Sequence, residues 1–483
     1  MKYRKIYKYK FVKEEDYEYL NELETVVSES KFLPKYHIYP KSGLMNDPNG
    51  LSYFNGEYHV FYQWFPFEPT HGMKHWGHVV SKDLIHWKDK GLALIPNKEY
   101  EKNGCYSGGA IEKDGLLYLF YTANYKTDNG KIPKQAVAVM DRDGNINKYE
   151  KNPIIDGAPL GFSGELRDPF VFKRNGLYYM LLGGSSSTKP ILNSFGDKGE
   201  LLIYKSENLL EWSYLGTIGL PIDTGYMLEC PSLVEIDGKD VLFLSPMGYK
   251  PKEENYNNRF ASIYLIGKLD IENLSFHMDT MDELDGGFDY YAPQAFYGKD
   301  NRVLTFAWFG CGEPMYESDK DMWKHGLTTP QALTIKNQQL YRYPIYELQQ
   351  MFHMSLLNEK VIKTKSNNYH LRTEVINDNE NYEISFGTER DIWKININSL
   401  KGKVTVDRSD LKNVIDLEYG LTRSTTVSNN REKIVLDIFV DNSFVEVYVN
   451  EGEKVLSFRV FNLSNQHEIR LPDNILAKLG YLK

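Results

Sequence analysis

The sequence has few cysteines, no long apolar run and no block of basic residues. Its three cysteines, Cys105, Cys230 and Cys311, follow neither a CxxC nor a His-paired spacing, which argues against a disulfide framework and a zinc site. No stretch approaches the roughly 18 to 20 apolar residues that cross a bilayer. Residues 1–13 alternate Lys or Arg with Tyr and lack the apolar core of a signal peptide. We therefore expect a cytoplasmic protein with free thiols and no membrane partner.

Acidic residues outnumber basic ones, with 66 Asp and Glu against 57 Lys and Arg and a net charge of −9 over 483 residues. This balance argues against nucleic acid as a partner. Aromatic residues are abundant, at 14% with 36 Tyr. Aromatic rings suit the apolar C–H faces of a sugar in a binding cleft, but they also favour β-strands, and both interpretations stay open.

A turn followed by an alternating apolar strand recurs about every 60 residues. The turns, 59, 61, 62 and 63 residues apart, begin at Asn55, Asp114, Asn175, Asp237 and Asp300. Asn-Gly and Asp-Gly between apolar runs predict β-hairpins, because a type I′ turn needs positive φ at both central residues. A second piece, Ser81 to Trp87, recurs two periods later as Ser206 to Trp212. Five units of four strands predict an all-β fold with a five-bladed β-propeller.

The repeat is flanked by segments of a different character. Residues Glu14 to Ser30 predict an amphipathic helix with Tyr17, Leu20, Leu23 and Val27 on one face. Glu347 to Met354 predicts a short linker helix, and the strands Ile434–Val440 and Phe444–Val449 predict a β-sandwich. The expected domains are an N-terminal extension with a short helix (1–35), a propeller catalytic domain (36–345), a linker helix (346–356) and a β-sandwich (357–483).

Three acids lie seven or eight residues before the turns of three blades, namely Asp47, Asp168 and Glu229. Ser107 and the run from Tyr291 to Gln294 hold this place in the other two blades. Equivalent positions of a propeller face the same channel, so we predict that the acids converge on one mouth. Gathering like charges costs free energy, which indicates chemistry or an ion. An arginine beside Asp168 argues against a metal site, and no metal or other cofactor is expected.

Hydrolysis of a glycosidic bond needs two carboxylates, one as nucleophile or base and one as proton donor. Asp47 lies near Asn46 and Asn49, whose hydrogen bonds would keep it ionised as a nucleophile. Glu229 has apolar sequence neighbours, which predict a raised pKa and a role as general acid. Asp168, paired with the adjacent arginine, is predicted to stay charged and to stabilise positive charge on the sugar.

Three motifs contain these acids: Asn46-Asp47-Pro48-Asn49-Gly50, Arg167-Asp168-Pro169 and Glu229-Cys230. With them the sequence resembles glycoside hydrolase family 32, the invertase and sucrose-6-phosphate hydrolase family of β-fructofuranosidases. The similarity runs from Tyr36-His37 to Phe458-Arg459. Within the family, the stretch from Gln63 to Trp76 is most similar to bacterial intracellular sucrose-6-phosphate hydrolases.

The resemblance implies a five-bladed propeller followed by a β-sandwich, and hydrolysis with retention through a covalent fructosyl-enzyme. By motif position, Asp47 would be the nucleophile, Glu229 the acid/base and Asp168 the stabiliser of the transition state. The expected substrate-binding residues are Leu44, Met45, Asn46, Gln63, Trp76, Tyr106, Ser107, Arg167 and Trp308. For Trp76 and Trp308, packing within the strands remains an alternative.

We expect a small-molecule sugar substrate, sucrose 6-phosphate, with sucrose cleaved more slowly. A phosphate on the glucose calls for a basic residue at the pocket rim, and the candidates are Lys74, His75, Arg259, Lys324 and His325. The alternatives are a fructan or fructo-oligosaccharide β-fructosidase, an inverting five-bladed hydrolase of arabinan-type chains, a non-catalytic sugar-binding propeller and a protein-scaffold propeller.

Overall fold

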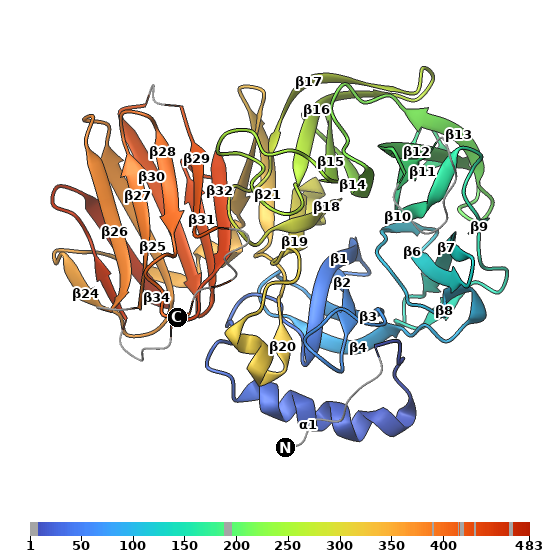
Figure 1. Cartoon of the computed structure of the whole chain (residues 1–483), viewed down its shortest axis with the longest axis horizontal. Coiled ribbons are helices and arrows are strands. Elements are labelled where there is room, and N and C mark those ends of the chain that lie inside the picture. Colours follow the sequence, from blue (N-terminus) through green and yellow to red (C-terminus); the bar gives the residue numbers. More distant parts are fainter. Residues whose placement is uncertain are drawn as a thin grey trace.

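The computed structural model describes residues 8–187, 196–388, 391–413, 415, 420–428, 431–462 and 467–483. Residues 1–7 of the expected N-terminal extension therefore lie outside the described part. A ring of five sheets lies beside a two-sheet sandwich, whose strands are orange and red in Figure 1. Within the described ranges no helix is both long enough and apolar enough to cross a membrane.

The predicted hairpin turns each join the first two strands of one propeller blade. Asn55 and Gly56 have φ of 50° and 84°, and the four later turns also have positive φ, as type I′ geometry requires. The predicted five-bladed propeller is confirmed. Its blades are β1 (Gly43–Phe54), β2 (Glu57–Phe65), β3 (His75–Ser81) and β4 (Lys88–Leu94); β5 (Ala110–Lys113), β6 (Leu116–Thr127), β7 (Gly130–Met140) and β8 (Ile146–Lys148), with β9 (Ile155–Asp156) on β7; β10 (Phe162–Arg174), β11 (Leu177–Ser186), β12 (Lys198–Ser206) and β13 (Ser213–Ile218); β14 (Met227–Ile236), β15 (Lys239–Met247), β16 (Ile263–Asp270) and β17 (Ser275–Glu283); β18 (Tyr291–Tyr297), β19 (Val303–Trp308), β21 (Gln331–Lys336) and β22 (Gln339–Pro344).

A two-residue strand from the fifth blade closes the ring. β20 (Trp323–Lys324) lies between β19 and β21 in the chain but pairs parallel with the start of β1. The N–H of Gly43 also donates to the carbonyl of Met322 at 2.7 Å. Trp323 is fully buried. The last blade is thereby joined to the first, and closure removes an exposed sheet edge.

The predicted N-terminal helix is present as α1 (Tyr17–Ser28), after a 3₁₀ turn at Glu14–Asp16. It lies beneath the first blade in Figure 1. Leu20, Leu23 and Val27 are buried as expected, whereas Tyr17 is 48% exposed. The expected linker helix is shorter than predicted: α2 covers Tyr346–Gln349, and Phe352–Leu356 is β23 of the sandwich. Phe352 is buried in the core between the two bodies, against Phe439 and Tyr36, which favours a strand there.

The C-terminal part is a sandwich of two six-stranded sheets, as predicted. The strands Lys433–Asp441 (β30) and Phe444–Val449 (β31) form the expected hairpin. In spatial order the first sheet is β23, β34 (Leu476–Leu482), β25 (Asn368–Ile376), β30, β31 and β32 (Lys454–Arg459). The second is β24 (Val361–Lys363), β33 (Glu468–Arg470), β26 (Asn381–Thr388), β27 (Asp391–Asn398), β28 (Lys403–Asp407) and β29 (Thr422–Thr426).

Buried charges hold the sandwich against the chain that enters the propeller. Asp441, at the end of β30, is fully buried and accepts hydrogen bonds from the backbone N–H groups of Lys35, Tyr36 and His37 at 2.6, 2.9 and 3.1 Å. The His37 ring bonds Asp441 at 2.8 Å and lies 3.5 Å from Glu446. Burial alone would lower the pKa of His37, but these two carboxylates raise it to about 9.

This histidine makes stability depend on pH. Because its pKa in the folded protein, about 9, lies above the unfolded value of 6.5, its contribution is complete below about pH 6.5 and is lost as the pH rises through 9. A shift of this size corresponds to a contribution of the order of 3 kcal/mol. Urea unfolding at pH 6.5 and pH 9.5 should show the loss. A His37→Gln variant that loses as much stability as the wild type over this range would contradict the assignment.

Candidate active site

A bulge at the same place in four blades turns side chains toward the central channel. The first strand loses its register with the second at Met45/Pro48, Arg167/Phe170, Glu229/Ser232 and Tyr291/Gln294. In each blade a proline follows the bulging residue, at Pro48, Pro169, Pro231 and Pro293. Bulges re-aim side chains and are common beside active sites.

The position of each acid relative to these prolines shows that the three acids are not all equivalent, contrary to expectation. Asp47 and Asp168 directly precede a proline, but in the fourth blade Cys230 has this place and Glu229 comes one residue earlier. The Cys230 thiol accordingly contacts both aspartates, at 3.7 Å from Asp47 Oδ2 and 3.5 Å from Asp168 Oδ2. Glu229 instead shares its place with Arg167 and Tyr291, and both of these side chains donate hydrogen bonds to it.

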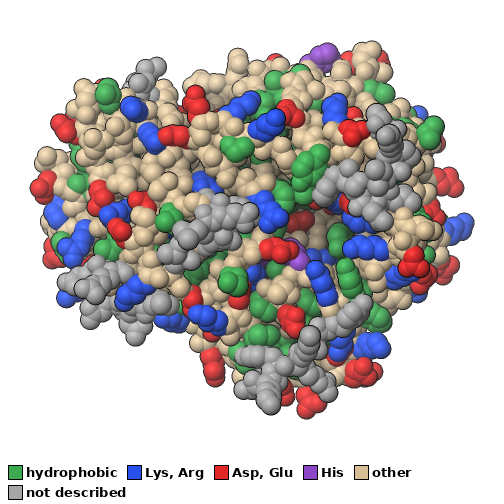
Figure 2. Space-filling view, in the orientation of Figure 1, with side chains coloured by type: hydrophobic (Ala, Val, Ile, Leu, Met, Phe, Trp, Pro, Cys, Tyr) green, Lys and Arg blue, Asp and Glu red, His purple; other side chains and the backbone are tan. Residues whose placement is uncertain are grey.

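The acids line a cavity of about 420 Å³ at one mouth of the channel. Figure 2 shows the propeller face hollowed near its centre, with Lys and Arg side chains around the hollow. Nine of the twelve predicted site residues line this cavity: Asp47, Asp168, Glu229, Asn46, Gln63, Tyr106, Ser107, Arg167 and Trp308. Residues from all five blades therefore meet in one pocket.

Asp47 is surrounded by hydrogen-bond donors. Asn46 Nδ2 donates to Oδ1 at 3.1 Å, and Gln63 Nε2 and the Ser107 hydroxyl donate to Oδ2. Burial raises the pKa of Asp47, while the bonds from Ser107 and Asn46 lower it. Asn49, expected to bond Asp47, instead accepts the N–H of Gly108 at 3.1 Å. The carboxylate is thus fixed in orientation by donors from the first two blades.

Glu229 faces polar groups, contrary to the expectation drawn from its apolar sequence neighbours. Arg167 donates to Oε1 through Nε at 2.9 Å, and the Tyr291 hydroxyl donates to Oε2 at 2.6 Å. The arginine bonds Glu165 as well. In a bulged strand the neighbours in sequence point away from the side chain, so their apolar character does not describe its surroundings.

Asp168 is the acid whose protonation the site perturbs most clearly. Burial, reinforced by the charge of Glu229, raises its pKa to about 7, and Arg167 opposes this shift. The backbone N–H of Cys230 donates to Asp168 Oδ2 at 2.9 Å. The expected pairing with the adjacent Arg167 is not formed, because that guanidinium bonds Glu229 and Glu165. One of the clustered acids therefore retains a proton near neutral pH.

Three expected substrate contacts do not line the pocket. Leu44 and Met45 are 1% and 0% exposed and belong to the strand core. Trp76 is also fully buried, and its ring N–H donates to the carbonyl of Tyr106 at 3.0 Å. Trp76 thus supports the pocket wall from behind.

Of the five basic residues considered as phosphate ligands, two line the cavity and three do not. Lys74 and Arg259 line the cavity. His75 is buried and bonds the N–H of Val12 and the carbonyl of Met73, and Lys324 donates to Asp319 at 2.9 Å. His325 is fully buried between Trp308 and Tyr316. Only the first two of the five can reach a ligand in this pocket.

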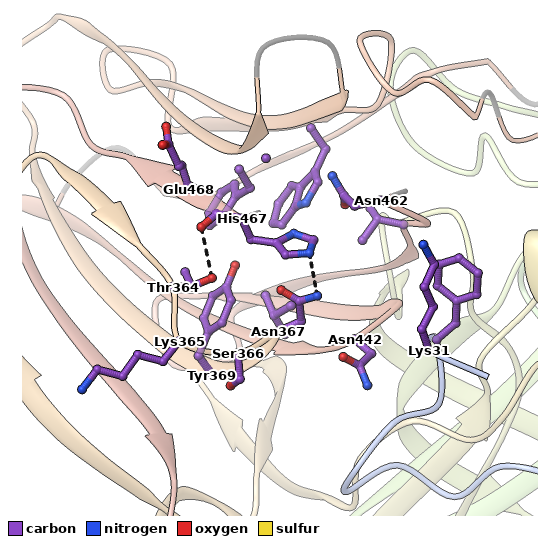
Figure 3. Close-up of a pocket in the computed structure, with 16 residues that line it drawn as sticks. Lys31, Thr364, Lys365, Ser366, Asn367, Tyr369, Asn442, Asn462, His467 and Glu468 are labelled. Carbon is purple, nitrogen blue, oxygen red and sulfur yellow. Dashed lines mark hydrogen bonds between the residues drawn. The ribbon is translucent and has the colours of Figure 1, made fainter. Parts of the chain in front are cut away.

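A second cavity, of about 200 Å³, lies in the sandwich and is shown in Figure 3. Its polar side chains largely bond the protein itself: Asn367 Nδ2 lies 2.8 Å from His467 Nε2, and Thr364 donates to the carbonyl of His467. Its carboxylate, Glu468, pairs with Arg470. No pair of acids is present among the described lining residues, so the hydrolytic chemistry is assigned to the propeller. In the described part of the chain no group of three His, Cys, Asp or Glu is placed to hold a metal ion.

A propeller with buried carboxylates at one mouth, joined to a β-sandwich, defines a glycoside hydrolase. Residues 37–344 match the model of the glycosyl hydrolases family 32 N-terminal domain, and residues 347–477 match that of the family 32 C terminal. The chain therefore belongs to glycosyl hydrolases family 32, as the motifs indicated.

Relatives and solved structures agree with this assignment. The chain is 34% identical to a sucrose-6-phosphate hydrolase of Staphylococcus xylosus, covering 96% of this chain and 94% of that one. It is also 34% identical to a Bacillus subtilis sucrose-6-phosphate hydrolase, covering 94% of each. The structure of sucrose-6-phosphate hydrolase from Lactobacillus gasseri superposes with a TM-score of 0.92 at 33% identity, covering 99% and 98%. A Bombyx mori GH32 beta-fructofuranosidase gives 0.84 at 30% identity, covering 97% of each.

Proposed function

We propose that the protein hydrolyses the β-fructofuranosyl bond of sucrose 6-phosphate, with retention of configuration, through a covalent fructosyl-enzyme. The observation that carries this proposal is the pocket in which Asp47, held by three donors, shares a cavity with Glu229, held by Arg167 and Tyr291. The names of the bacterial relatives and of the Lactobacillus gasseri structure support the phosphorylated substrate. A variant of the Bombyx mori enzyme in complex with sucrose supports the sugar class.

In the first step, Asp47 attacks the anomeric carbon of the fructosyl unit and Glu229 gives its proton to the departing glycosidic oxygen. The attacking carboxylate is held in place by Asn46, Gln63 and Ser107. Less entropy is therefore lost when the transition state forms. This step needs a proton on Glu229, which lies in the same cavity as the attacking carboxylate.

In the second step, Glu229 takes a proton from water, and the resulting hydroxide displaces Asp47 from the sugar. Positive charge develops on the fructosyl ring in both transition states. The carboxylate of Asp168, fixed by the Cys230 N–H, faces that charge and stabilises it. Arg167 and Tyr291 hold Glu229 in place for both proton transfers.

Basic groups that line the pocket favour a phosphorylated leaving group. Lys74 is buried and donates to Asn46 Oδ1 at 2.7 Å, and burial lowers its pKa to about 7. Lys126 and Arg259 lie around the same cavity, although the chain as a whole carries a charge of −9. A local excess of positive charge draws an anionic substrate to the pocket.

We expect kcat/KM for sucrose 6-phosphate to exceed that for sucrose by about 10-fold or more, because one charge-assisted hydrogen bond contributes about 1.5 to 3 kcal/mol. Initial rates with both sugars on the purified protein measure this ratio, with an Asp47→Asn variant as the blank. Equal turnover of plain sucrose would instead make the protein a general β-fructosidase. No turnover of either sugar would overturn the proposed substrate.

A further inference from the structure

The segment from Lys8 to Val12, at the start of the described chain, is fixed against the loop that carries His71 and Lys74. The carbonyl of Lys8 accepts the N–H of Met73 at 2.7 Å. The N–H of Val12 donates to the buried ring of His75 at 3.0 Å, and the Val12 side chain is buried. The segment is therefore anchored at both ends, at Lys8 to the loop between β2 and β3 and at Val12 to the first residue of β3.

This anchoring brings Lys8 and Tyr9 to the wall of the cavity that contains Asp47 and Glu229. The Lys126 ammonium lies 5.4 Å from the centre of the Tyr9 ring and bonds its hydroxyl at 3.4 Å. Lys8 is exposed, and within the described residues its ammonium has no carboxylate partner. The nearby Lys10, by contrast, pairs with Asp16.

Positive charges accumulate where this segment meets the loop. The charge of Lys8 contributes to the lowered pKa of both His71 and Lys74, after the larger effect of burial. Like charges gathered at an open rim repel one another, and a bound anion relieves that repulsion. Of the acids that line the cavity, Asp47, Asp168 and Glu229 act, as proposed, on the fructosyl unit, and the charge of Glu313 offsets only part of the effect on Lys74.

We propose that Lys8 is a specificity-determining residue: its ammonium binds the phosphate of the leaving sugar, and the segment it belongs to forms the outer wall of the leaving-group site. This inference rests on the proposed function, since it needs a phosphorylated substrate. A phosphate monoester dianion presents several acceptor oxygens, so Lys8 can share it with Lys74 and Arg259, which line the same cavity. In this arrangement Lys8 does not contact the fructosyl unit.

The test compares Lys8→Ala and Lys8→Glu with the wild type on sucrose 6-phosphate and on sucrose. We expect Lys8→Ala to lower kcat/KM for sucrose 6-phosphate about 5-fold, mainly through KM, and Lys8→Glu to lower it 10-fold or more. Turnover of sucrose should change less than about 2-fold. Lys13→Ala is the matched control, because Lys13 is an exposed lysine that directly follows this segment and does not line the cavity.

The outcomes separate this inference from the function on which it rests. A wild type that prefers sucrose 6-phosphate, with a preference that both Lys8 variants retain, overturns the role of Lys8 and leaves the function standing. Equal losses on both sugars mean that Lys8 supports the fold of the rim, which also overturns the inference. If the wild type shows no preference for the phosphorylated sugar, both the proposed substrate and the role of Lys8 are overturned.

Discussion

Replacing Asp47 by Asn is expected to lower kcat on sucrose 6-phosphate by four orders of magnitude or more, while the protein still folds. An amide has nearly the shape of the carboxylate, and its oxygen can still accept the bonds from Gln63 and Ser107. It is not a nucleophile, so the covalent intermediate cannot form, and loss of a nucleophile costs about this much. Steady-state rates and the melting temperature measure the two parts of the prediction.

Removing one of three clustered carboxylates also relieves repulsion between like charges. The melting temperature of Asp47→Asn should therefore equal or exceed that of the wild type. A variant that keeps kcat within about 10-fold of the wild type would refute the nucleophile role. A variant that loses activity together with its cooperative melting transition would indicate that Asp47 supports the fold.

The propeller could be predicted because its turns demand a particular backbone. Asn55-Gly56 and its counterparts adopt positive φ, which few residue pairs tolerate, so the repeat is visible in the sequence. The closing strand Trp323–Lys324 has no such signal, because two residues show no periodicity and their partners lie 280 residues earlier. The end of the linker helix was missed because packing of Phe352 between the two bodies decides its conformation.

The acids of the site could be found from their register, but their surroundings could not. Asp168 lies in a bulge and Glu229 directly before one. The neighbours in sequence do not surround these side chains, so the expected apolar setting of Glu229 and the expected Arg167–Asp168 pair were wrong. The prolines that follow the bulges were a usable signal, since they place Cys230 rather than Glu229 opposite the aspartates. Lys8 had no sequence signal, because only long-range hydrogen bonds bring it to the pocket.

Glu229→Gln is expected to separate the proton transfers from the rest of the mechanism. Its kcat on sucrose 6-phosphate and on sucrose should fall by about 1000-fold or more, because the leaving alkoxide then departs without a proton. With β-fructofuranosyl fluoride the rate of the first step should fall much less, since fluoride leaves without protonation. Fluoride release would then begin as a burst of about one equivalent and stall, because no base activates the water that completes the cycle. Release of fluoride and of fructose, followed separately, measures both steps.

A small anionic nucleophile such as azide needs no base, so it should restart turnover of the fluoride and give fructosyl azide of retained configuration. The matched control is Glu235→Gln, because Glu235 lies on the same strand but is exposed and pairs with Lys268 outside the pocket. That variant should behave as the wild type with every substrate. If Glu229→Gln loses activity equally on sucrose and on the fluoride, and azide has no effect, Glu229 positions the sugar and another group supplies the proton. In that case Asp168, whose pKa is raised to about 7 by burial and by Glu229, becomes the candidate proton donor.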